Sequence, residues 1–554
     1  MSKGNAAMPG SRVSALVLAA MMAVALGALL VRNIGLNPAI FSDEWYYSKM
    51  ARLDPVSAAM VPSYLYLWVF SASNACGDRF LDCVRVGNAL FFVGGAPFVY
   101  LIARQVISPR LSLFATALSL LAPLNLHTTF FMPESMYYFG FCVLSWVALT
   151  RTGWHWATYA FTTGAVLGLL ALVKVHAVFL LPALCLFVLY VTANRESLAT
   201  GLVPMLLTAG AAALVRFGLG FLFAGRAGLE LFGSFYGSGA RQAAHHTLAQ
   251  LLPPALVNAW GHLMALALVL ALPMALLLEM VVSKGARARA APQLIWLQVY
   301  ALLMLVAAAG MTIAFTASLA GAGATEVIRL HMRYYDFVFP LLFIVGAAQL
   351  GQADTARRPL LAWTIALFVA ALLVAGVVFL PHYLASAPDG PDLAGIDLRR
   401  WFWRAIFGLD LLVLFLWARG SRHAGALFLF AALPLAILAA DRGVQRYVRQ
   451  LVTSWGPDNA GRFAHRYVPP REHKEVTLVG SDMAELFRVQ FYLDDKDAVL
   501  VDLPPGAPVD PCRLPSHNKW LLVVGDHPLP AGMRPVAATK DYALVRLAAP
   551  MCGR

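Results

Sequence analysis

Thirteen apolar runs follow one another along most of the chain, separated by short polar connections. A transmembrane helix needs about 20 predominantly apolar residues. Runs meeting or approaching that length lie at 13–32, 84–103, 111–130, 134–150, 157–173, 176–193, 201–223, 255–281, 294–317, 337–351, 360–380, 403–418 and 424–440. The pattern predicts an α-helical polytopic membrane protein of about thirteen transmembrane helices, and we expect the first run to be retained as a helix rather than cleaved as a signal peptide.

The pattern changes after the last run. Short β-branched runs bounded by Gly, Pro and Asp are typical of strands, and they lie at 476–479, 498–502, 521–524 and 542–546. Residues 482–492 have helical spacing with an aspartate near the start. The sequence therefore predicts two domains: a transmembrane domain at 1–441, whose first outer loop covers 33–83, and a small α/β domain at 442–554.

The charges predict an orientation. The chain is 60% hydrophobic and 13% charged, with a formal net charge of +13, whereas soluble domains carry about 25% charged residues. Every second connection carries arginine, at 104 and 110, 151, 195, 287 and 289, 357 and 358, and 419 and 422. Because cytoplasmic loops are rich in Lys and Arg, we expect a cytoplasmic N-terminus and a periplasmic C-terminal domain in a bacterial inner membrane. Nucleic acid is not an expected partner.

The cysteines agree with that orientation. Cys76 and Cys83 share the first outer loop, and Cys512 and Cys552 share the C-terminal domain. Both pairs suit disulfides in an oxidising compartment.

Four groups of polar residues lie near the predicted outer boundary. They are Asp43 with Glu44, Glu134, Lys174 with His176, and the segment 329–336. Each also has a local explanation. The first two acids suit the start of a surface helix, Glu134 suits a first helical turn, Lys174 suits snorkelling, His176 suits packing, and Arg333 suits interfacial anchoring.

Together these groups predict one kind of chemistry. A carboxylate suits a general base that removes a proton from a hydroxyl. Lys and Arg suit the stabilisation of a phosphate leaving group, and tyrosines offer stacking faces for a sugar. No Walker motif, dinucleotide-binding glycine motif or H-E-x-x-H appears. We therefore expect transfer of a group from a membrane-soluble phosphate carrier to an acceptor hydroxyl outside the cytoplasm.

With these motifs the chain resembles the GT-C superfamily of polyprenyl-phosphate-sugar-dependent membrane glycosyltransferases. It is similar in layout to the bacterial branch with the lipid A aminoarabinose transferases and relatives of protein O-mannosyltransferases. The matching segments are Ser42-Asp-Glu-Trp-Tyr-Tyr47, Pro133-Glu134, Lys174, and Arg333-Tyr334 with Pro340. One departure is that residues 60–68 contain no lysine, where the aminoarabinose transferases carry one just before the proline-aromatic segment of this loop. A pentose such as arabinofuranose and a hexose both remain open, and the acceptor is a glycan, a lipid or a protein.

The resemblance implies roles for individual residues. Asp43 would be the catalytic base of a single inverting displacement. Glu44 and Glu134 would complete the catalytic acids by helping to bind the sugar or acceptor, or by holding a divalent cation such as Mg, Mn or Ca, as in some relatives. Lys174 and Arg333 would bind the donor phosphate. Substrate-binding residues would be Tyr46, Tyr47, His176, His331, Tyr334 and Tyr335.

Other classes remain as alternatives. A transporter or flippase of lipid-linked glycans would carry charges along several spans and pseudo-symmetric halves, whereas this chain concentrates its charges at one boundary. A polymerase or ligase of lipid-linked glycans and a non-catalytic assembly scaffold are the others.

Overall fold

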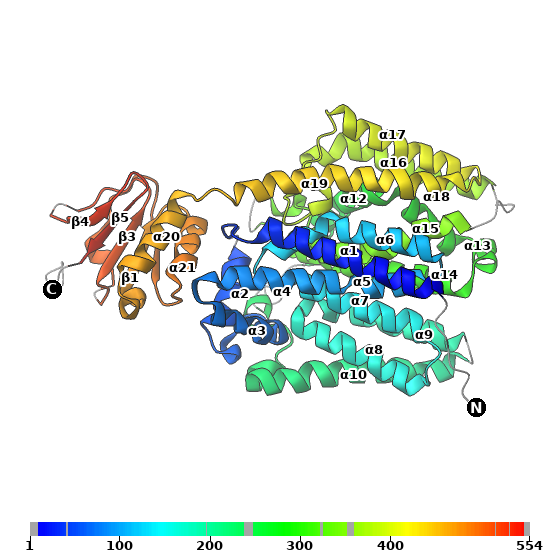
Figure 1. The fold of residues 1–554 in the computed structure, drawn as a ribbon, viewed down its shortest axis with the longest axis horizontal. Coiled ribbons are helices and arrows are strands. Elements are labelled where there is room, and N and C mark those ends of the chain that lie inside the picture. Colours follow the sequence, from blue (N-terminus) through cyan, green and yellow to red (C-terminus); the bar gives the residue numbers. More distant parts are fainter. Residues whose placement is uncertain are drawn as a thin grey trace.

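The computed structural model describes residues 9–39, 42–194, 197–237, 247–321, 325–351, 359–515, 517–530 and 532–547. A long helical bundle carries a small α/β domain at one end, as Figure 1 shows. The helices of the bundle are α1 (Pro9–Asn33), α2 (Ser42–Arg52), α3 (Tyr64–Phe70), α4 (Phe80–Gly94), α5 (Ala96–Ala103), α6 (Pro109–Leu121), α7 (Glu134–Thr150), α8 (Trp156–Val173), α9 (Leu181–Ala193), α10 (Leu198–Ala224), α12 (Leu248–Val282), α13 (Lys284–Arg289), α14 (Pro292–Ser318), α15 (Phe339–Ala348), α16 (Pro359–Phe379), α17 (Trp401–Ala418), α18 (His423–Leu427) and α19 (Leu433–Gln450).

The prediction of a multi-pass helical membrane protein is confirmed, but with fewer long spans than thirteen. In the described ranges 10 helices are long and apolar enough to cross a membrane, or 11 if a bent pair counts as one span. That pair is α6 with a 3-10 helix at Pro123–Thr129, bent by 49°. The other two predicted runs form α7, which has 17 residues, and the short apolar segment Asp336–Gly351. Proline at 123, 133 and 340 starts or bends these segments, because its ring and missing N–H interrupt a helix.

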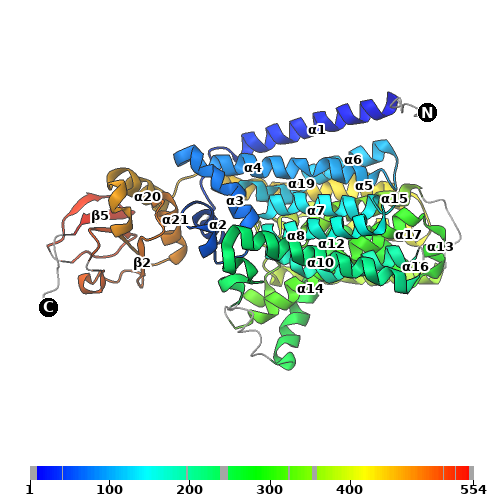
Figure 2. The same cartoon turned by 90° about the horizontal axis from the view of Figure 1, so that it is seen from below.

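The two ends of the bundle differ in what they carry. The start of α1 lies at the end away from the α/β domain, and α1 runs along the outside of the bundle toward that domain (Figure 2). It packs beside α4 and α6. Its outward side chains are strongly exposed, as at Val24 (73%) and Val31 (86%), which suits a helix surrounded by lipid.

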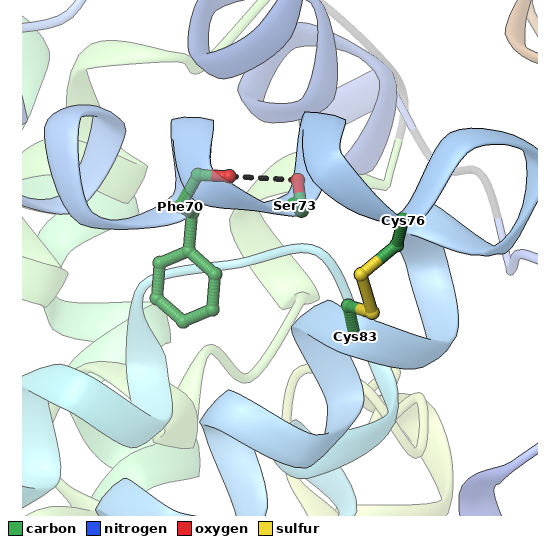
Figure 3. The surroundings of a disulfide bond; sticks show 4 residues. All are labelled: Phe70, Ser73, Cys76 and Cys83. Atoms are coloured by element: carbon green, nitrogen blue, oxygen red, sulfur yellow. Dashed lines mark hydrogen bonds between the residues drawn. A yellow bond between two sulfur atoms is a disulfide. The ribbon is translucent and has the colours of Figure 1, made fainter.

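The first outer loop folds into short helices at the end of the bundle next to the α/β domain. It contains α2 and α3 together with 3-10 helices at Val56–Ala58 and Ser71–Arg79. Figure 3 shows the disulfide between Cys76 and Cys83, which joins the second 3-10 helix to α4 and confirms the first predicted pair. Cys552 of the second predicted pair lies outside the described residues.

The C-terminal domain is a five-stranded sheet with two helices. Its helices are α20 (Gly456–Tyr467) and α21 (Met483–Leu493), and its strands are β1 (Val476–Gly480), β2 (Val499–Asp502), β3 (Trp520–Val524), β4 (Pro535–Ala538) and β5 (Tyr542–Arg546). The strand order is β2-β1-β3-β5-β4, with β1 parallel to β2 and β3, and β5 antiparallel to β3 and β4. Sequence analysis predicted four of these strands and α21, but not β4 or α20.

Burial explains this arrangement. Every residue of β1 and β3 is buried, as expected for central strands covered on both faces. Leu478 and Leu522 pack with Leu486 and Val489 of α21 on one face, while Val479 and Val523 face a second cluster. The bundle's last helix, α19, continues to Gln450, beyond the boundary expected at 441.

The C-terminal domain is docked on the first outer loop. Arg52 at the end of α2 makes two hydrogen bonds of 2.8 Å to the carboxylate of Asp494. Asp494 follows α21 in the left-handed conformation, with φ of 60°, which aspartate tolerates better than most residues. Trp45 of α2 meets Phe491 edge to face at 6.2 Å. The domain therefore fixes α2, which carries the first acidic motif.

Candidate active site

The neighbouring acids of α2 have different surroundings. The Asp43 side chain is 37% exposed, and its Oδ2 lies 3.0 Å from Nη2 of Arg333. Glu44 is fully buried, and its two carboxylate oxygens accept hydrogen bonds from the backbone N–H groups of Ala39 at 2.8 Å and Phe131 at 3.0 Å. Successive helical residues point about 100° apart. Asp43 therefore faces Arg333, while Glu44 binds the backbone at Ala39 and Phe131.

Arg333 is held by an acid that sequence analysis did not single out. It lies on the 3-10 helix Met332–Tyr334, and its Nε is 3.4 Å from Oδ1 of Asp389. Its backbone N–H also donates to the Asp389 carbonyl at 2.8 Å. The side chains of Arg329, His331 and Ser386 contact the same carboxylate at 2.7, 3.2 and 2.7 Å. Asp389 therefore organises the whole segment 329–333.

The pKa of Asp389 reflects these contacts. Burial alone would raise it. The hydrogen bond with His331 and the charges of Arg333 and Arg329 outweigh burial, and they hold the pKa of Asp389 well below its usual range. The carboxylate stays ionised at neutral pH, as the positioning of two arginines requires.

Lys174 lies at a break in its span. Its backbone is extended, with φ of −150° and ψ of 125°, so α8 ends at Val173 and a 3-10 helix starts at Val175. The ammonium group lies 2.8 Å from Oε1 of Glu134, the first residue of α7, and the two side chains are only 6% and 5% exposed. Burying such a pair is expensive unless its contacts are good, so this position requires an explanation beyond snorkelling.

The ring of Tyr334 connects the two cations. Nζ of Lys174 lies 4.8 Å from the ring centroid, and Nη2 of Arg333 donates to its hydroxyl at 3.2 Å. His176 stacks on the ring at 4.6 Å and His331 at 5.6 Å. Burial raises the pKa of Tyr334 to about 12, so its hydroxyl stays protonated and can also donate a hydrogen bond.

The remaining predicted tyrosines are placed differently from one another. Tyr47 is buried beside the cluster: burial raises its pKa, and the charges of Glu134 and Asp43 add to that rise. Tyr46 packs on Phe487 of the C-terminal domain at 5.7 Å. Tyr335 bonds through its hydroxyl to Nδ1 of His262 inside the bundle at 2.7 Å. The structure thus gathers Asp43, Tyr47, Glu134, Lys174, His176, His331, Arg333 and Tyr334, while Glu44, Tyr46 and Tyr335 make their contacts elsewhere.

A second layer of polar residues lies behind the cluster. Nε2 of His127 is 3.4 Å from Oδ2 of Asp336. Burial and the charge of Asp336 raise the pKa of Asp392 well above its usual range. A cavity of about 10 Å³ lined by His127, Glu134, Arg333 and Asp336 has room for a single water. Sequence analysis did not single out His127 or Asp392. Two features of the sequence could have indicated them: a histidine inside the apolar run 111–130, and the outer segment Asp389-Gly-Pro-Asp392.

A divalent cation does not fit these residues. No group of three or more His, Cys, Asp or Glu side chains suited to a metal occurs in the described ranges. The carboxylates of Asp43, Glu134 and Asp389 lie instead against arginine or lysine.

Comparisons with known proteins give structural similarity alone. Searches of protein-family models and of curated proteins found no match. The chain is similar to ArnT from Cupriavidus metallidurans bound to undecaprenyl phosphate, with 15% identity, a TM-score of 0.49, and coverage of 97% of this chain and 99% of that one. It is similar to apo ArnT from the same organism, with 17% identity, a TM-score of 0.48 and coverage of 97% and 98%.

A third similarity is to the Archaeoglobus fulgidus oligosaccharyltransferase tethered with an acceptor peptide. It has 13% identity and a TM-score of 0.47, and it covers 91% of this chain and 68% of that one. The similarity to these three structures extends over most of this chain. At these identities and TM-scores it concerns the layout of the fold, and no activity is carried across.

Proposed function

We propose that this chain is an inverting glycosyltransferase that moves a sugar from a polyprenyl-phosphate carrier to an acceptor hydroxyl. The observation that carries the proposal is the contact of Asp43 with Arg333 at 3.0 Å, close to Lys174, since both cations lie within about 5 Å of the Tyr334 ring centroid. A partly exposed base and two buried cations thus meet at one end of a helical bundle. General-base removal of a proton and stabilisation of a phosphate leaving group require those groups together.

The proposed step is a single displacement. The acceptor oxygen attacks the anomeric carbon as Asp43 takes its proton. The bond from that carbon to the phosphate oxygen breaks on the opposite face, and its electron pair stays on the carrier phosphate. Arg333 and Lys174 stabilise this developing charge, and arginine does so through two N–H groups at once.

The surroundings of the acids favour Asp43 as the base. Both oxygens of Glu44 accept backbone hydrogen bonds, and Glu134 is buried against Lys174. Asp43 has the more exposed carboxylate, at 37%, so an acceptor can approach it. Glu134 is proposed to hold Lys174 in place and to bind the sugar through its second oxygen. The step includes no metal ion.

The substrate class follows from the aromatic faces. Tyr334, His176 and His331 stack in one group, and such faces suit the apolar side of a sugar ring. The proposed sugar is a pentose such as arabinofuranose, or a hexose. The proposed acceptor is an envelope glycan, lipid or protein on the periplasmic side of a bacterial inner membrane, with the N-terminus in the cytoplasm.

The decisive experiment is glycan analysis of envelope extracts from cells with and without the gene. We expect one sugar residue to be missing without it. The wild-type chain and Asp54→Asn, a control acid in the same outer loop 3.8 Å from Lys496, should restore the residue, whereas Asp43→Asn at equal expression should not. Unchanged glycans in the deleted strain, or restoration by Asp43→Asn, would contradict the proposal. Partial restoration by Asp43→Asn would favour a transporter of lipid-linked glycans.

A further inference from the structure

A second polar cavity lies away from the candidate active site, between the first outer loop and the C-terminal domain. Its volume is about 250 Å³. Its walls come from the residues just after α1, from the start of α4, from α20 and from the end of α21. It includes none of the residues gathered around Tyr334, so the proposed transfer reaction does not account for it.

Its charges are unbalanced in favour of cations. Four arginines line it, at 79, 85, 462 and 466, together with three aspartates. Each aspartate already lies beside a basic side chain: Asp82 is 3.4 Å from Arg85, Asp494 is 2.8 Å from Arg52, and Asp78 is 3.7 Å from His465. In the part of the chain that the structure describes, Arg79, Arg462 and Arg466 have no carboxylate partner. Three guanidinium groups around one cavity favour an anion with several oxygens.

The cavity walls are held in place by contacts of their own. The disulfide in Figure 3 ties Cys76, just before Asp78 and Arg79, to Cys83 of α4. Arg462 donates to Oδ1 of Asn37 at 2.5 Å and to the hydroxyl of Tyr492 at 3.0 Å. A site that is already formed loses little conformational entropy when it binds a ligand.

The position of the cavity points to a lipid as the source of the anion. Gly35 and Leu36 line it, immediately after α1 ends at Asn33. Helix α1 runs along the outside of the bundle in Figure 2 and exposes apolar side chains along its length, such as Val13 (61%) and Val24 (73%). Acyl chains lying along this face would bring a headgroup to the end of the helix, where the arginines are.

We propose that this cavity binds the phosphate group of an anionic phospholipid in the outer leaflet. Arg79 and Arg466, both exposed, donate hydrogen bonds to the phosphate oxygens, and Arg462 forms the wall behind them. The buried Arg85 donates to the carbonyls of Leu36 at 2.6 Å and Asn37 at 3.1 Å. The headgroup would therefore stabilise the segment that leads from α1 to α2 and Asp43.

The test is lipid retention by the purified full-length protein, which does not depend on the transferase reaction. Native mass spectrometry would follow binding of phosphatidylglycerol, with phosphatidylcholine as the zwitterionic comparison. We expect phosphatidylglycerol to be preferred by the wild type, and the double variant Arg79→Ala with Arg466→Ala to lose at least about tenfold in its affinity. The matched control is Arg399→Ala with Arg404→Ala, two exposed arginines just before and within the start of α17, which should bind as the wild type does.

Each outcome decides the proposal. Equal retention by the double variant and the wild type, or equal loss in the control, would overturn it. A parallel titration with inorganic phosphate separates the sources. In one outcome the wild type binds phosphate saturably, the double variant does not, and neither retains phosphatidylglycerol. This outcome would support an anion site and contradict a lipid as its ligand. Phosphatidylglycerol retention with weak phosphate binding is the expected result.

Discussion

Two buried ion pairs in this chain differ in how completely the polar atoms in and around them are hydrogen-bonded. In the C-terminal domain, Asp458 accepts from Nε of Arg488 through one oxygen and from the Trp455 backbone N–H, at 2.7 Å, through the other. In the bundle, Glu134 bonds to Lys174 through one oxygen only. In the described ranges its second oxygen, Nδ1 of His176 and Nε2 of His331 have no hydrogen-bond partner.

The difference separates a structural pair from a candidate binding site. A buried polar atom without a partner costs about 1–3 kcal/mol, so a fold does not accumulate several of them around one ring without a reason. At Asp458 the fold itself supplies a hydrogen-bond partner for each carboxylate oxygen. Around Tyr334 the open atoms leave capacity for a sugar hydroxyl, a phosphate oxygen or a water.

The largest effect should follow from breaking the structural pair. Asp458→Ala leaves the guanidinium of Arg488 without its carboxylate, and breaking a buried pair costs about 3–5 kcal/mol. We expect that loss in the unfolding free energy of the full chain in detergent, followed by tryptophan fluorescence. Asp497→Ala, which breaks an exposed pair with Lys496 in the same domain, should cost less than about 1 kcal/mol. Equal losses of unfolding free energy in both variants would contradict the structural role of the Asp458–Arg488 pair.

The next effect concerns chemistry. Arg333→Gln removes a cation from the proposed leaving group, and losing one such donor lowers rates about 100- to 1,000-fold. Formation of the glycan product should fall by that factor. Arg329→Gln is the matched control, because Arg329 contacts Asp389 but lies 37% exposed, and in the described part of the chain no ion pair joins it to Asp43. Similar losses in the two variants would show that Arg333 acts only through Asp389.

A smaller effect on stability should accompany a complete loss of function in a double variant. Replacing a buried ion pair by neutral residues is often nearly neutral for stability. Glu134→Gln with Lys174→Met should therefore unfold within about 1 kcal/mol of the wild type, while Lys174→Met alone is less stable. Product formation should be lost in both variants. Activity in the stable double variant would assign the Lys174–Glu134 pair to structure.

The smallest effect is a pH dependence. The pKa of folded Asp389 lies below its ordinary value of 3.8, so its contribution to stability is present above that pH. The contribution is lost as the pH falls through the lower, folded-state pKa. Acid unfolding of the wild type should therefore be steeper below about pH 4 than that of Asp389→Asn. Identical profiles would show that Asp389 does not hold the segment 329–333 by its charge.

The sequence by itself determined the elements. Long apolar runs must form helices in a membrane, because unbonded backbone groups cannot face lipid, and short β-branched runs between turn residues became β1, β2, β3 and β5. The meeting of Asp43 with Arg333 was also predictable, since both were expected at one membrane depth and the ion pair is observed. The expected role of Glu134 in binding the sugar or acceptor stays a prediction, whereas its ion pair with Lys174 is a finding of the structure.

Only the tertiary structure decided which polar side chains face the same space. Asp43 and Glu44 are neighbours in the chain, yet one contacts Arg333 and the other binds backbone amides, because rotation along a helix separates adjacent side chains. Sequence analysis did not single out Asp389, and only the fold shows that it contacts Arg333. The arginines of the second cavity come from two domains. Such contacts depend on packing between distant segments, which no local pattern of residues records.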